Sequence, residues 1–378
     1  MRTARLRYLA MLWGLGLTDG AAAQDLLISN ARVIVGNGEV IERATIVIER
    51  GRIASISADP VADAASPVLD ARGLTAMPGF VDAHRQLISG DPDAWTAQAA
   101  DAMREYAEAG FTTVLSLGDA LEHVVALRER LDTREIAGPR LVVSGPIRLT
   151  ADDGDSLPDA ALREAVQALT LAGADAIHTV LESPDGGGIE ALSIAKDEAD
   201  QQGLLTLTDA AAVDAALAAV RGGSGYLTRT PRLGGLDEDT ARELVEAGAG
   251  NAEFGLVTTS ALGASTDAEA GPTGPANARQ LREAGVILAF GTGSERAPRD
   301  ALRHELTLLE SVFSNAAIID ILTRSAAFAV RRDDALGTLE PGKIGDVVLL
   351  EGDPLTDLDD LLNVRIVVRT GRIIVDNR

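Results

Sequence analysis

The sequence contains no cysteine, and this absence excludes several functions at once. Without a thiol there is no disulfide, no cysteine nucleophile and no lipid-modified cysteine behind a leader segment. Aromatic residues are also scarce, at 3% of the chain, although 46% of the residues are hydrophobic. The core must therefore consist of alanine, valine, leucine and isoleucine, and the apolar content is too high for a disordered chain.

Lysine and arginine residues are also few compared with acidic residues. The chain has 34 lysine and arginine residues against 57 aspartate and glutamate residues, which gives a formal net charge of -23. A negative charge of this size repels nucleic-acid backbones and anionic membrane surfaces. We therefore expect no nucleic-acid partner.

The sequence also lacks an apolar run long enough to cross a membrane. Three arginines precede an apolar run from Tyr8 to Leu17, and small residues from Ala21 to Ala23 follow it. A run of about 10 residues is short of the roughly 20 that a membrane-spanning helix needs. The pattern predicts a cleaved signal peptide over residues 1–24 and a periplasmic or secreted mature protein without a membrane span.

Both ends of the mature chain show short alternating apolar runs broken by turns. Asn37-Gly38 near the start and Thr370-Gly371 near the end are typical hairpin turns. We predict that the segments 25–77 and 338–378 together form a small β-sandwich beside the main domain. The predicted strands are Leu26 to Val35, Ala44 to Ile48, Ile53 to Ile56, Asp346 to Leu350, Val364 to Val368 and Arg372 to Val375.

The central segment, 78–337, alternates buried-strand patterns with helical patterns, and several of its helices end at glycine. Eight alternations predict an α/β fold, a (β/α)8 TIM-like barrel. The predicted strands are the segment ending at His84, Phe111 to Leu117, Arg140 to Ile147, Ala174 to Leu181, Leu204 to Thr208, Tyr226 to Thr230, Ala252 to Thr259 and Val286 to Phe290.

Two stretches resemble a known family. They are PGFVDAH at 78–84 and LGTLEPGKIGDVVLLEGDPL at 336–355. They are similar to the opening and closing signatures of the amidohydrolase superfamily, in its imidazolonepropionase and prolidase-like branch of metal-dependent hydrolases. The resemblance implies a barrel with a metal centre that hydrolyses carbon-nitrogen bonds. In the family, the ligands are a histidine pair on strand one, a carboxylated lysine on strand four, one histidine each on strands five and six, and an aspartate on strand eight.

Strands one and four depart from that ligand set. Strand one keeps His84 and has Gln86 in place of the second imidazole, and a neutral amide is a poor ligand for these metals. The family's bridging lysine corresponds to His178, which cannot form a carbamate. The resemblance therefore implies that a binuclear centre would lack its bridge here.

The other three strands depart further. The ligand position on strand five falls at Thr206, or at Thr208 if the register shifts by one inward position, and that on strand six falls at Thr228. A threonine hydroxyl is not a usual ligand for these metals. On strand eight, Gly293 stands where the family has its aspartate. The predicted degenerate positions are thus Gln86, Thr206, Thr228 and Gly293, and His84 and His178 are the residual metal candidates.

Two carboxylates are further catalytic candidates, because they follow predicted barrel strands. Asp209 follows strand five and Glu182 follows strand four, although a residue in such a place also caps the next helix in many proteins. The remaining histidines, His123 and His304, lie in helical segments and are interpreted as helix-packing residues.

These observations leave three hypotheses. The favoured one is an exported family member with a degenerate metal centre, which serves as a non-catalytic or binding homologue and needs no cofactor. It would bind a small-molecule ligand, and a homo-oligomer is compatible with it. The second is an active hydrolase of cyclic amides or small peptides that uses His84, His178 and a carboxylate with zinc or another divalent metal. The third is metal-free lyase or isomerase chemistry with His178 as general base.

The first hypothesis is favoured because strands five, six and eight lack their ligands together. No residue is then left to hold and deprotonate a hydrolytic water.

Overall fold

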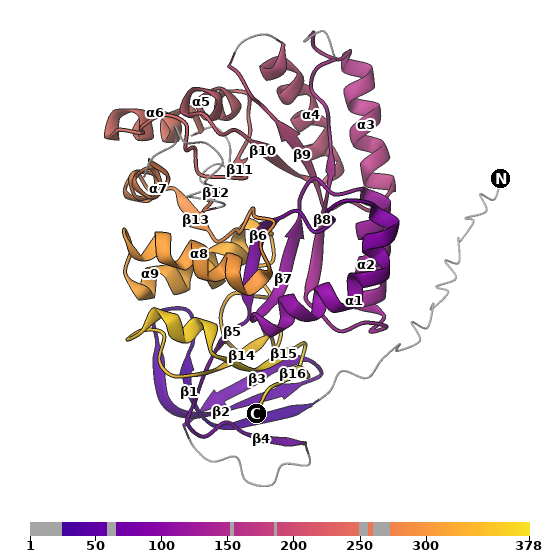
Figure 1. Cartoon of the computed structure of the whole chain (residues 1–378). Helices are drawn as coiled ribbons and strands as arrows, with labels where there is room; N and C mark the ends of the chain where they lie inside the picture. The colour runs from indigo at the N-terminus through magenta and orange to yellow at the C-terminus, as the bar shows by residue number, and fades with distance from the viewer. Residues whose placement is uncertain (1–24, 59–65, 152–154, 185–186, 249–255, 260–272) are drawn as a thin grey trace, which may run out of the picture.

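The computed structural model describes residues 25–58, 66–151, 155–184, 187–248, 256–259 and 273–378. The predicted signal peptide, at 1–24, lies outside the described residues. Two sheets organise this part of the chain: a curled parallel sheet surrounded by helices, and a mixed sheet below it (Figure 1).

The parallel sheet contains eight strands in sequence order, from β6 to β13. Each predicted barrel strand overlaps one of them, because long runs of β-branched and apolar residues suit strands buried on both faces. Two backbone hydrogen bonds link β6 to the residues that follow β13: Ala83 N–H donates to Phe290 O at 2.9 Å, and Gly293 N–H donates to His84 O at 2.9 Å. The strands are β6 (Phe80–Arg85), β7 (Phe111–Ser116), β8 (Arg140–Pro146), β9 (Ala176–Val180), β10 (Leu205–Asp209), β11 (Tyr226–Leu227), β12 (Leu256–Thr258) and β13 (Ile287–Ala289).

Helices follow the strands and cover the outer face of the parallel sheet (Figure 1). Their ends follow local chemistry: Asp91 accepts a hydrogen bond from Ala94 N–H to start α1, and Gly203 ends α4 at a φ of 74°. Within the described ranges, no helix is long and apolar enough to cross a membrane. The helices are α1 (Pro92–Glu108), α2 (Leu121–Asp132), α3 (Asp159–Leu171), α4 (Gly188–Gln202), α5 (Val213–Arg221), α6 (Glu238–Gly248), α7 (Thr273–Glu283), α8 (Pro298–Glu310), α9 (Asn315–Asp320) and α10 (Ala326–Ala329), with a π-helical turn, η1 (Ile321–Ser325), and a 3-10 helix, η2 (Leu358–Leu362).

The second sheet joins the two ends of the chain, as the sequence predicts. Its order is β16-β15-β14-β5-β1-β2-β3, with β4 paired to β1. The joint is the antiparallel pair β14–β5, in which Leu349 lies opposite Ala76. Both predicted hairpin turns are confirmed, while the sandwich arrangement stays a prediction. The strands are β1 (Leu26–Ile34), β2 (Val40–Glu49), β3 (Arg52–Ser57), β4 (Val68–Asp70), β5 (Leu74–Pro78), β14 (Val347–Glu351), β15 (Val364–Arg369) and β16 (Arg372–Asp376).

Gly79 connects the two sheets. It is the one residue between β5, in the middle of the mixed sheet, and β6, the first strand of the parallel sheet. A Cβ atom at this position would lie 2.1 Å from Thr112 Oγ1, so only glycine fits the crossing. Along β14, Val348 packs into the main core, whereas Val347 packs into the separate core of the mixed sheet. The mixed sheet thus fixes the strand that carries His84.

Candidate functional site

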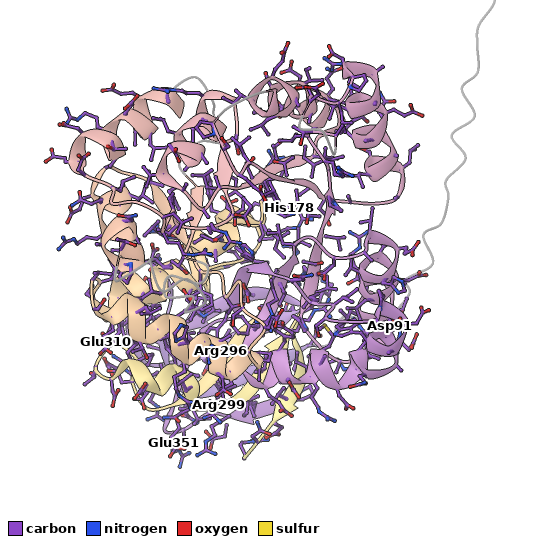
Figure 2. All side chains as sticks on the ribbon, turned by 45° about the horizontal axis from the view of Figure 1, so that its top comes forward. Asp91, His178, Arg296, Arg299, Glu310 and Glu351 are labelled. Carbon is purple, nitrogen blue, oxygen red and sulfur yellow. The ribbon has the colours of Figure 1, made fainter. Side chains whose placement is uncertain are left out.

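A cavity of about 600 Å³ lies at the carboxyl ends of the parallel strands. Catalytic groups of barrel enzymes come from this end of the strands. His178, one of its residues, appears near the centre of the view in Figure 2, whereas Asp91, Glu310 and Glu351 lie toward the periphery. The cavity brings together five of the residues considered from the sequence, namely His84, Gln86, His178, Asp209 and Gly293.

The ligand positions inferred for strands five and six are not among the residues that line the cavity. Thr206 and Thr228 are completely buried and do not line this cavity, and their hydroxyls have no hydrogen-bond partner among the described residues. The side chains that reach the cavity from these strands are those of Asp209 and Arg229. β10 extends to Asp209, one residue past its predicted end, and β11 stops at Leu227, three residues before its predicted end.

His84 is held firmly at the inner wall of the cavity. Its side chain is buried, and its Nδ1 is hydrogen-bonded to the carbonyl oxygen of Thr228. A carbonyl only accepts, so Nδ1 carries the proton and Nε2 keeps its lone pair. Burial, aided by the positive charge of Arg229, lowers the pKa of His84 to about 3. Gly291 leaves room for this histidine, because a Cβ atom there would lie 2.8 Å from His84 Cβ.

His178 is also uncharged near neutral pH. Burial lowers its pKa to about 4, while Asp209 raises it and Arg229 lowers it further. Its Nε2 is buried without a hydrogen-bond partner in the described part of the chain. An imidazole with so low a pKa is a weak proton acceptor, which counts against His178 as a general base. Glu182 does not share the main cavity, but lines a neighbouring one of about 470 Å³ together with His178.

Arg229 and Asp209 form an ion pair inside the cavity. The guanidinium Nη2 lies 2.5 Å from Asp209 Oδ2, with 20% and 16% of the two side chains exposed. Asp209 is therefore not a helix cap; the residue at the N-cap of α5 is Ala212, which makes no side-chain capping bond. Sequence reasoning missed Arg229, and the available signal was its place directly after Thr228.

Asp82 braces the first and last strands beneath the cavity. Its carboxylate is fully buried and accepts hydrogen bonds from Thr292 N–H at 3.0 Å, Thr292 Oγ1 at 2.6 Å and His84 N–H at 3.1 Å. Burial raises the pKa of this carboxyl group, and the hydrogen bonds oppose the rise. Asp82 thus sets the backbone position of His84.

Asp119 orders the loop that follows β6. It accepts hydrogen bonds from Leu87 N–H at 2.9 Å, Ile88 N–H at 2.8 Å and Ser116 Oγ at 2.6 Å. Leu87 and Ile88 both line the cavity, so this buried carboxylate shapes its wall. Burial raises the pKa of Asp119 as well.

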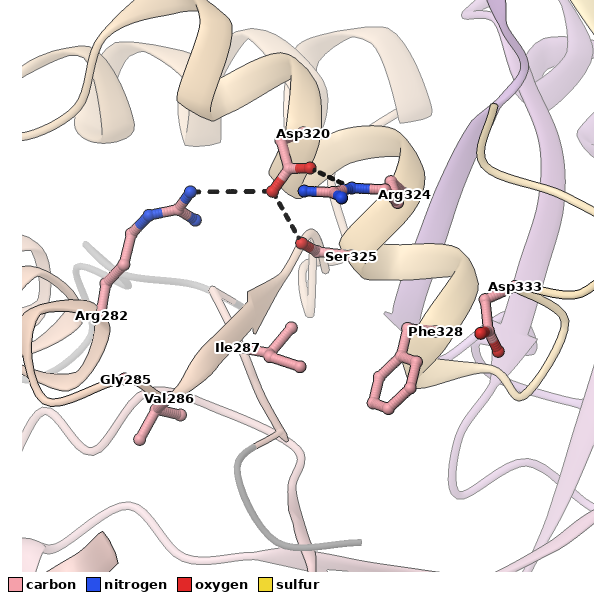
Figure 3. A pocket seen from close by; sticks show the side chains of 9 residues that line it. All are labelled: Arg282, Gly285, Val286, Ile287, Asp320, Arg324, Ser325, Phe328 and Asp333. Atoms are coloured by element: carbon pink, nitrogen blue, oxygen red, sulfur yellow. Dashed lines mark hydrogen bonds and ion pairs between the residues drawn. The ribbon is translucent and has the colours of Figure 1, made fainter. Parts of the chain in front are cut away.

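Another cavity, of about 510 Å³, lies at the opposite end of β13 (Figure 3). Its central carboxylate, Asp320, accepts hydrogen bonds from Arg324 Nε at 2.7 Å and Ser325 Oγ at 3.0 Å, and lies 3.7 Å from Arg282 Nη2. Asp320, Arg282 and Arg324 are engaged with one another, so the cavity at the carboxyl ends of the strands is the better candidate.

Comparison with known proteins identifies the family. A model of the amidohydrolase family matches residues 75–374, which is most of the chain and includes every residue of the candidate site. The protein belongs to the amidohydrolase family. No curated protein matches this chain in a sequence comparison.

Solved structures agree with this assignment. The chain resembles the solved structure of an amidohydrolase with a TM-score of 0.80 and 24% identity, over 93% of this chain and 99% of that one. It also resembles a Xaa-Pro dipeptidase with methionine bound in its active site, with a TM-score of 0.79 and 21% identity, over 93% and 99%. It also resembles an ochratoxinase from A. niger, with a TM-score of 0.78 and 19% identity, over 94% of this chain and 96% of that one. Identities this low show the fold alone, a TIM-like barrel.

A hydrolytic metal centre needs about three protein ligands around an open position. In the described ranges, no group of three or more histidine, aspartate or glutamate side chains is arranged to hold a metal ion.

Proposed function

We propose that this amidohydrolase-family protein binds a small molecule in the 600 Å³ cavity and does not act as a metal-dependent hydrolase. The observation that carries the proposal is the ion pair of Arg229 and Asp209 between the ends of β10 and β11. These strands supply two imidazole ligands in the family. Here they supply a guanidinium and a carboxylate that satisfy each other.

The charge of Arg229 argues against a divalent cation in the same place. Its effect on the pKa of His84 and of His178 means that its positive charge is felt at both imidazoles. A divalent cation bound to those imidazoles would face the same repulsion at short range, where screening by water is weak. Asp209, the nearest carboxylate partner, is already paired. The metal centre is therefore degenerate in our proposal.

The wall of the cavity suits a small polar ligand. Leu87, Ile88 and Leu117 supply apolar surface, while Gln86 and the Arg229–Asp209 pair supply polar groups. Small-molecule sites combine a largely apolar lining with a few convergent polar groups. The two neutral imidazoles add hydrogen-bonding groups without adding charge.

The proposal includes the architecture and location that the sequence predicts. We propose that the parallel sheet closes into a (β/α)8 barrel, which the bonds Ala83 to Phe290 and Gly293 to His84 support. We propose further that the mixed sheet folds into a sandwich, and that the segment 1–24 directs export to the periplasm or beyond.

Metal content provides the decisive test. The protein is produced in metal-supplemented culture, purified and measured by elemental analysis, and its thermal unfolding is followed with added zinc and with chelator. We expect far less than one equivalent of zinc, iron or manganese and no change of melting temperature in either direction. Near one equivalent of tightly held metal, with a melting temperature that falls on chelation, would overturn the proposal.

One observation favours the alternative of an active hydrolase. His84, His178 and Asp209 line the same cavity, and a rearrangement of Arg229 would free the carboxylate. Because a structural relative is a Xaa-Pro dipeptidase, hydrolysis of Xaa-Pro dipeptides with and without zinc discriminates the two functions. The proposal expects no turnover above that of a His84→Asn/His178→Asn variant.

A further inference from the structure

A smaller cavity, of about 360 Å³, lies where the β15–β16 hairpin meets the barrel-side loop between α2 and β8. It is at the amino end of β8, the opposite end of the strands from the candidate site. Four arginines line it, at positions far apart in the sequence. They are Arg134, Arg140, Arg369 and Arg372.

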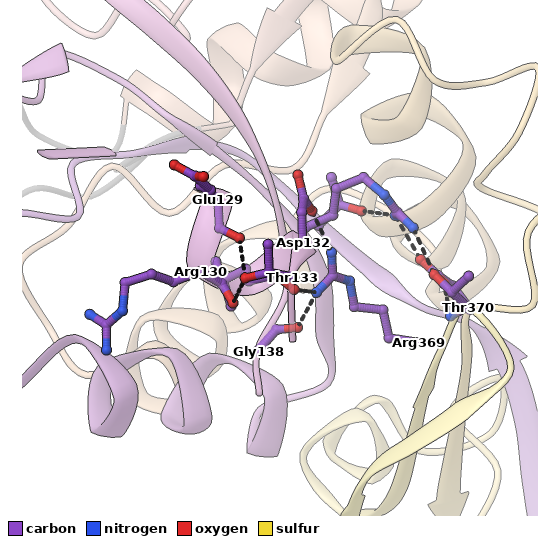
Figure 4. Close-up of polar contacts among 11 residues, drawn as sticks. Glu129, Arg130, Asp132, Thr133, Gly138, Arg369 and Thr370 are labelled. Carbon is purple, nitrogen blue, oxygen red and sulfur yellow. Dashed lines mark hydrogen bonds and ion pairs between the residues drawn. The ribbon is translucent and has the colours of Figure 1, made fainter. Parts of the chain in front are cut away.

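Two of these arginines hold the junction together. Arg369 donates to the carbonyl oxygens of Leu131 at 3.3 Å and Gly138 at 3.2 Å, and to Asp132 Oδ1 at 3.2 Å (Figure 4). Arg140 donates to the buried carboxylate of Asp346 at 2.9 Å. These bonds fix the two guanidinium groups in the cavity wall before any ligand arrives.

The other two arginines have no such role. Arg134 and Arg372 are exposed at the cavity and form no ion pair with any described residue. Four guanidinium groups therefore face only the carboxylates of Asp132 and Asp346 in this cluster, which leaves two excess positive charges. This excess is local, since the whole chain has a net charge of -23.

The wall also contains a buried donor that lacks a partner. Arg369 Nε has no acceptor among the described residues. Burial lowers the pKa of Arg369, and the neighbouring charge of Arg140 lowers it further. An added negative charge in the cavity would relieve the repulsion between these two cations.

We infer that this cavity is a second ligand site, which binds the oxyanion of a small molecule, a carboxylate or a phosphate. Guanidinium groups bind such planar or tetrahedral oxyanions through paired, charge-assisted hydrogen bonds. Leu131, Ile136, Ile373 and Ile374 line the same cavity and offer an apolar surface for the rest of an organic anion. The site bridges the mixed sheet and the barrel-side helices, so a bound anion would tie the two together.

Thermal unfolding of the full chain tests this inference. Inorganic phosphate, phenyl phosphate and benzoate are titrated at constant ionic strength, with sodium chloride as the reference salt. A ligand that binds only the folded state raises the melting temperature in a saturable manner. We expect saturation with at least one probe, and at least tenfold weaker apparent binding in the Arg134→Gln/Arg372→Gln variant.

The matched control is Arg242→Gln/Arg279→Gln, which removes two exposed arginines on α6 and α7 and changes the net charge equally. This variant should bind as the unchanged protein does. Tighter binding of phenyl phosphate or benzoate than of phosphate would identify an organic anion; equal binding of phenyl phosphate and phosphate would identify the phosphate group itself. No saturable effect with any probe, or an equal loss in the control, would overturn the inference.

Discussion

Arg229 Nη2 donates a hydrogen bond to Asp209 Oδ2 across 2.5 Å, and the pair joins the ends of β10 and β11 at the mouth of the cavity. Both side chains are mostly buried, so each charge depends on the other for compensation. In the family, the two strands that lead to this pair each carry a metal-binding histidine. The chemistry of this ion pair therefore decides whether the cavity only binds a small molecule or hydrolyses it.

Placing the family's ligand types at positions that line the cavity should create a metal site. We expect the variant Gln86→His/Asp209→His/Arg229→His/Gly293→Asp to bind about one equivalent of zinc, because the like charge is gone and three imidazoles and a carboxylate join His84. Isothermal titration with zinc measures this. Arg229→Ala alone, which removes the charge but adds no ligand, serves as the control. A folded variant that takes up no zinc would show that the ligand positions are assigned wrongly.

Acid should destabilise the protein through His84. Its pKa is about 3 when folded, against an ordinary value of about 6.5 when unfolded, so the unfolded state binds the proton more readily. Stability is therefore complete above pH of about 6.5 and falls as the pH drops toward 3. This histidine alone should cost about 2 kcal/mol at pH 5 relative to pH 8.

Urea unfolding at the two pH values checks this effect. In His84→Asn, the loss of stability between pH 8 and pH 5 should be smaller by about 2 kcal/mol. His123→Asn, which changes a histidine on α2 outside the cavity, should behave as the unchanged protein does. An unchanged acid sensitivity in His84→Asn would contradict the assignment.

Removal of the Asp82 carboxylate should be costly. Asp82→Ala leaves three buried donors, on Thr292 and His84, without their acceptor. Each unsatisfied buried group costs about 1–3 kcal/mol, so we expect a loss of at least about 3 kcal/mol in the free energy of unfolding. Asp82→Asn keeps one acceptor oxygen and should lose less. Asp101→Ala, at an exposed position on α1, should stay within about 0.5 kcal/mol of the unchanged protein.

Gly291 should not tolerate alanine. The added Cβ atom would lie 2.8 Å from His84 Cβ and 3.1 Å from Thr258 Cβ, and neither neighbour is a flexible chain end. We expect a loss of about 1–3 kcal/mol, typical of overpacking. Chemical denaturation measures it. At Gly235 a Cβ atom would meet nothing within 4 Å, so Gly235→Ala is the matched control and should be close to neutral.

The sequence predicts the fold better than it predicts the site. Strands such as β7 and β8 are evident because their residues are buried on both faces and form continuous apolar runs. Hairpin signals at both ends of the chain predict that the two ends form one module, and β14 and β5 do pair. His84, Gln86, His178 and Gly293 also line the cavity, because the carboxyl ends of the parallel strands meet at one end of the barrel-like sheet.

Residues at the end of a short strand were harder to place. β11 contains only Tyr226 and Leu227, and the direction of the chain beyond it is set by tertiary contacts, including the bond between His84 and Thr228 O. A periodic pattern cannot report such a change of direction, so Arg229 was missed. The sequence does not predict the arginine cluster of the 360 Å³ cavity, for another reason. Arg134 and Arg372 come together only through the packing of the mixed sheet against the loop after α2.

The place of β5 between β1 and β14 has a consequence for the order of folding. Until β14 is present, β5 offers an open edge whose hydrogen-bonding groups have no strand beside them. The missing partner comes near the far end of the chain, so the mixed sheet cannot be completed until almost the whole polypeptide has been made. Until then, the edge of β5 in the nascent chain is unpaired and can pair with a strand of another chain. The edge of β5 is therefore covered only after Val347–Glu351 has been made.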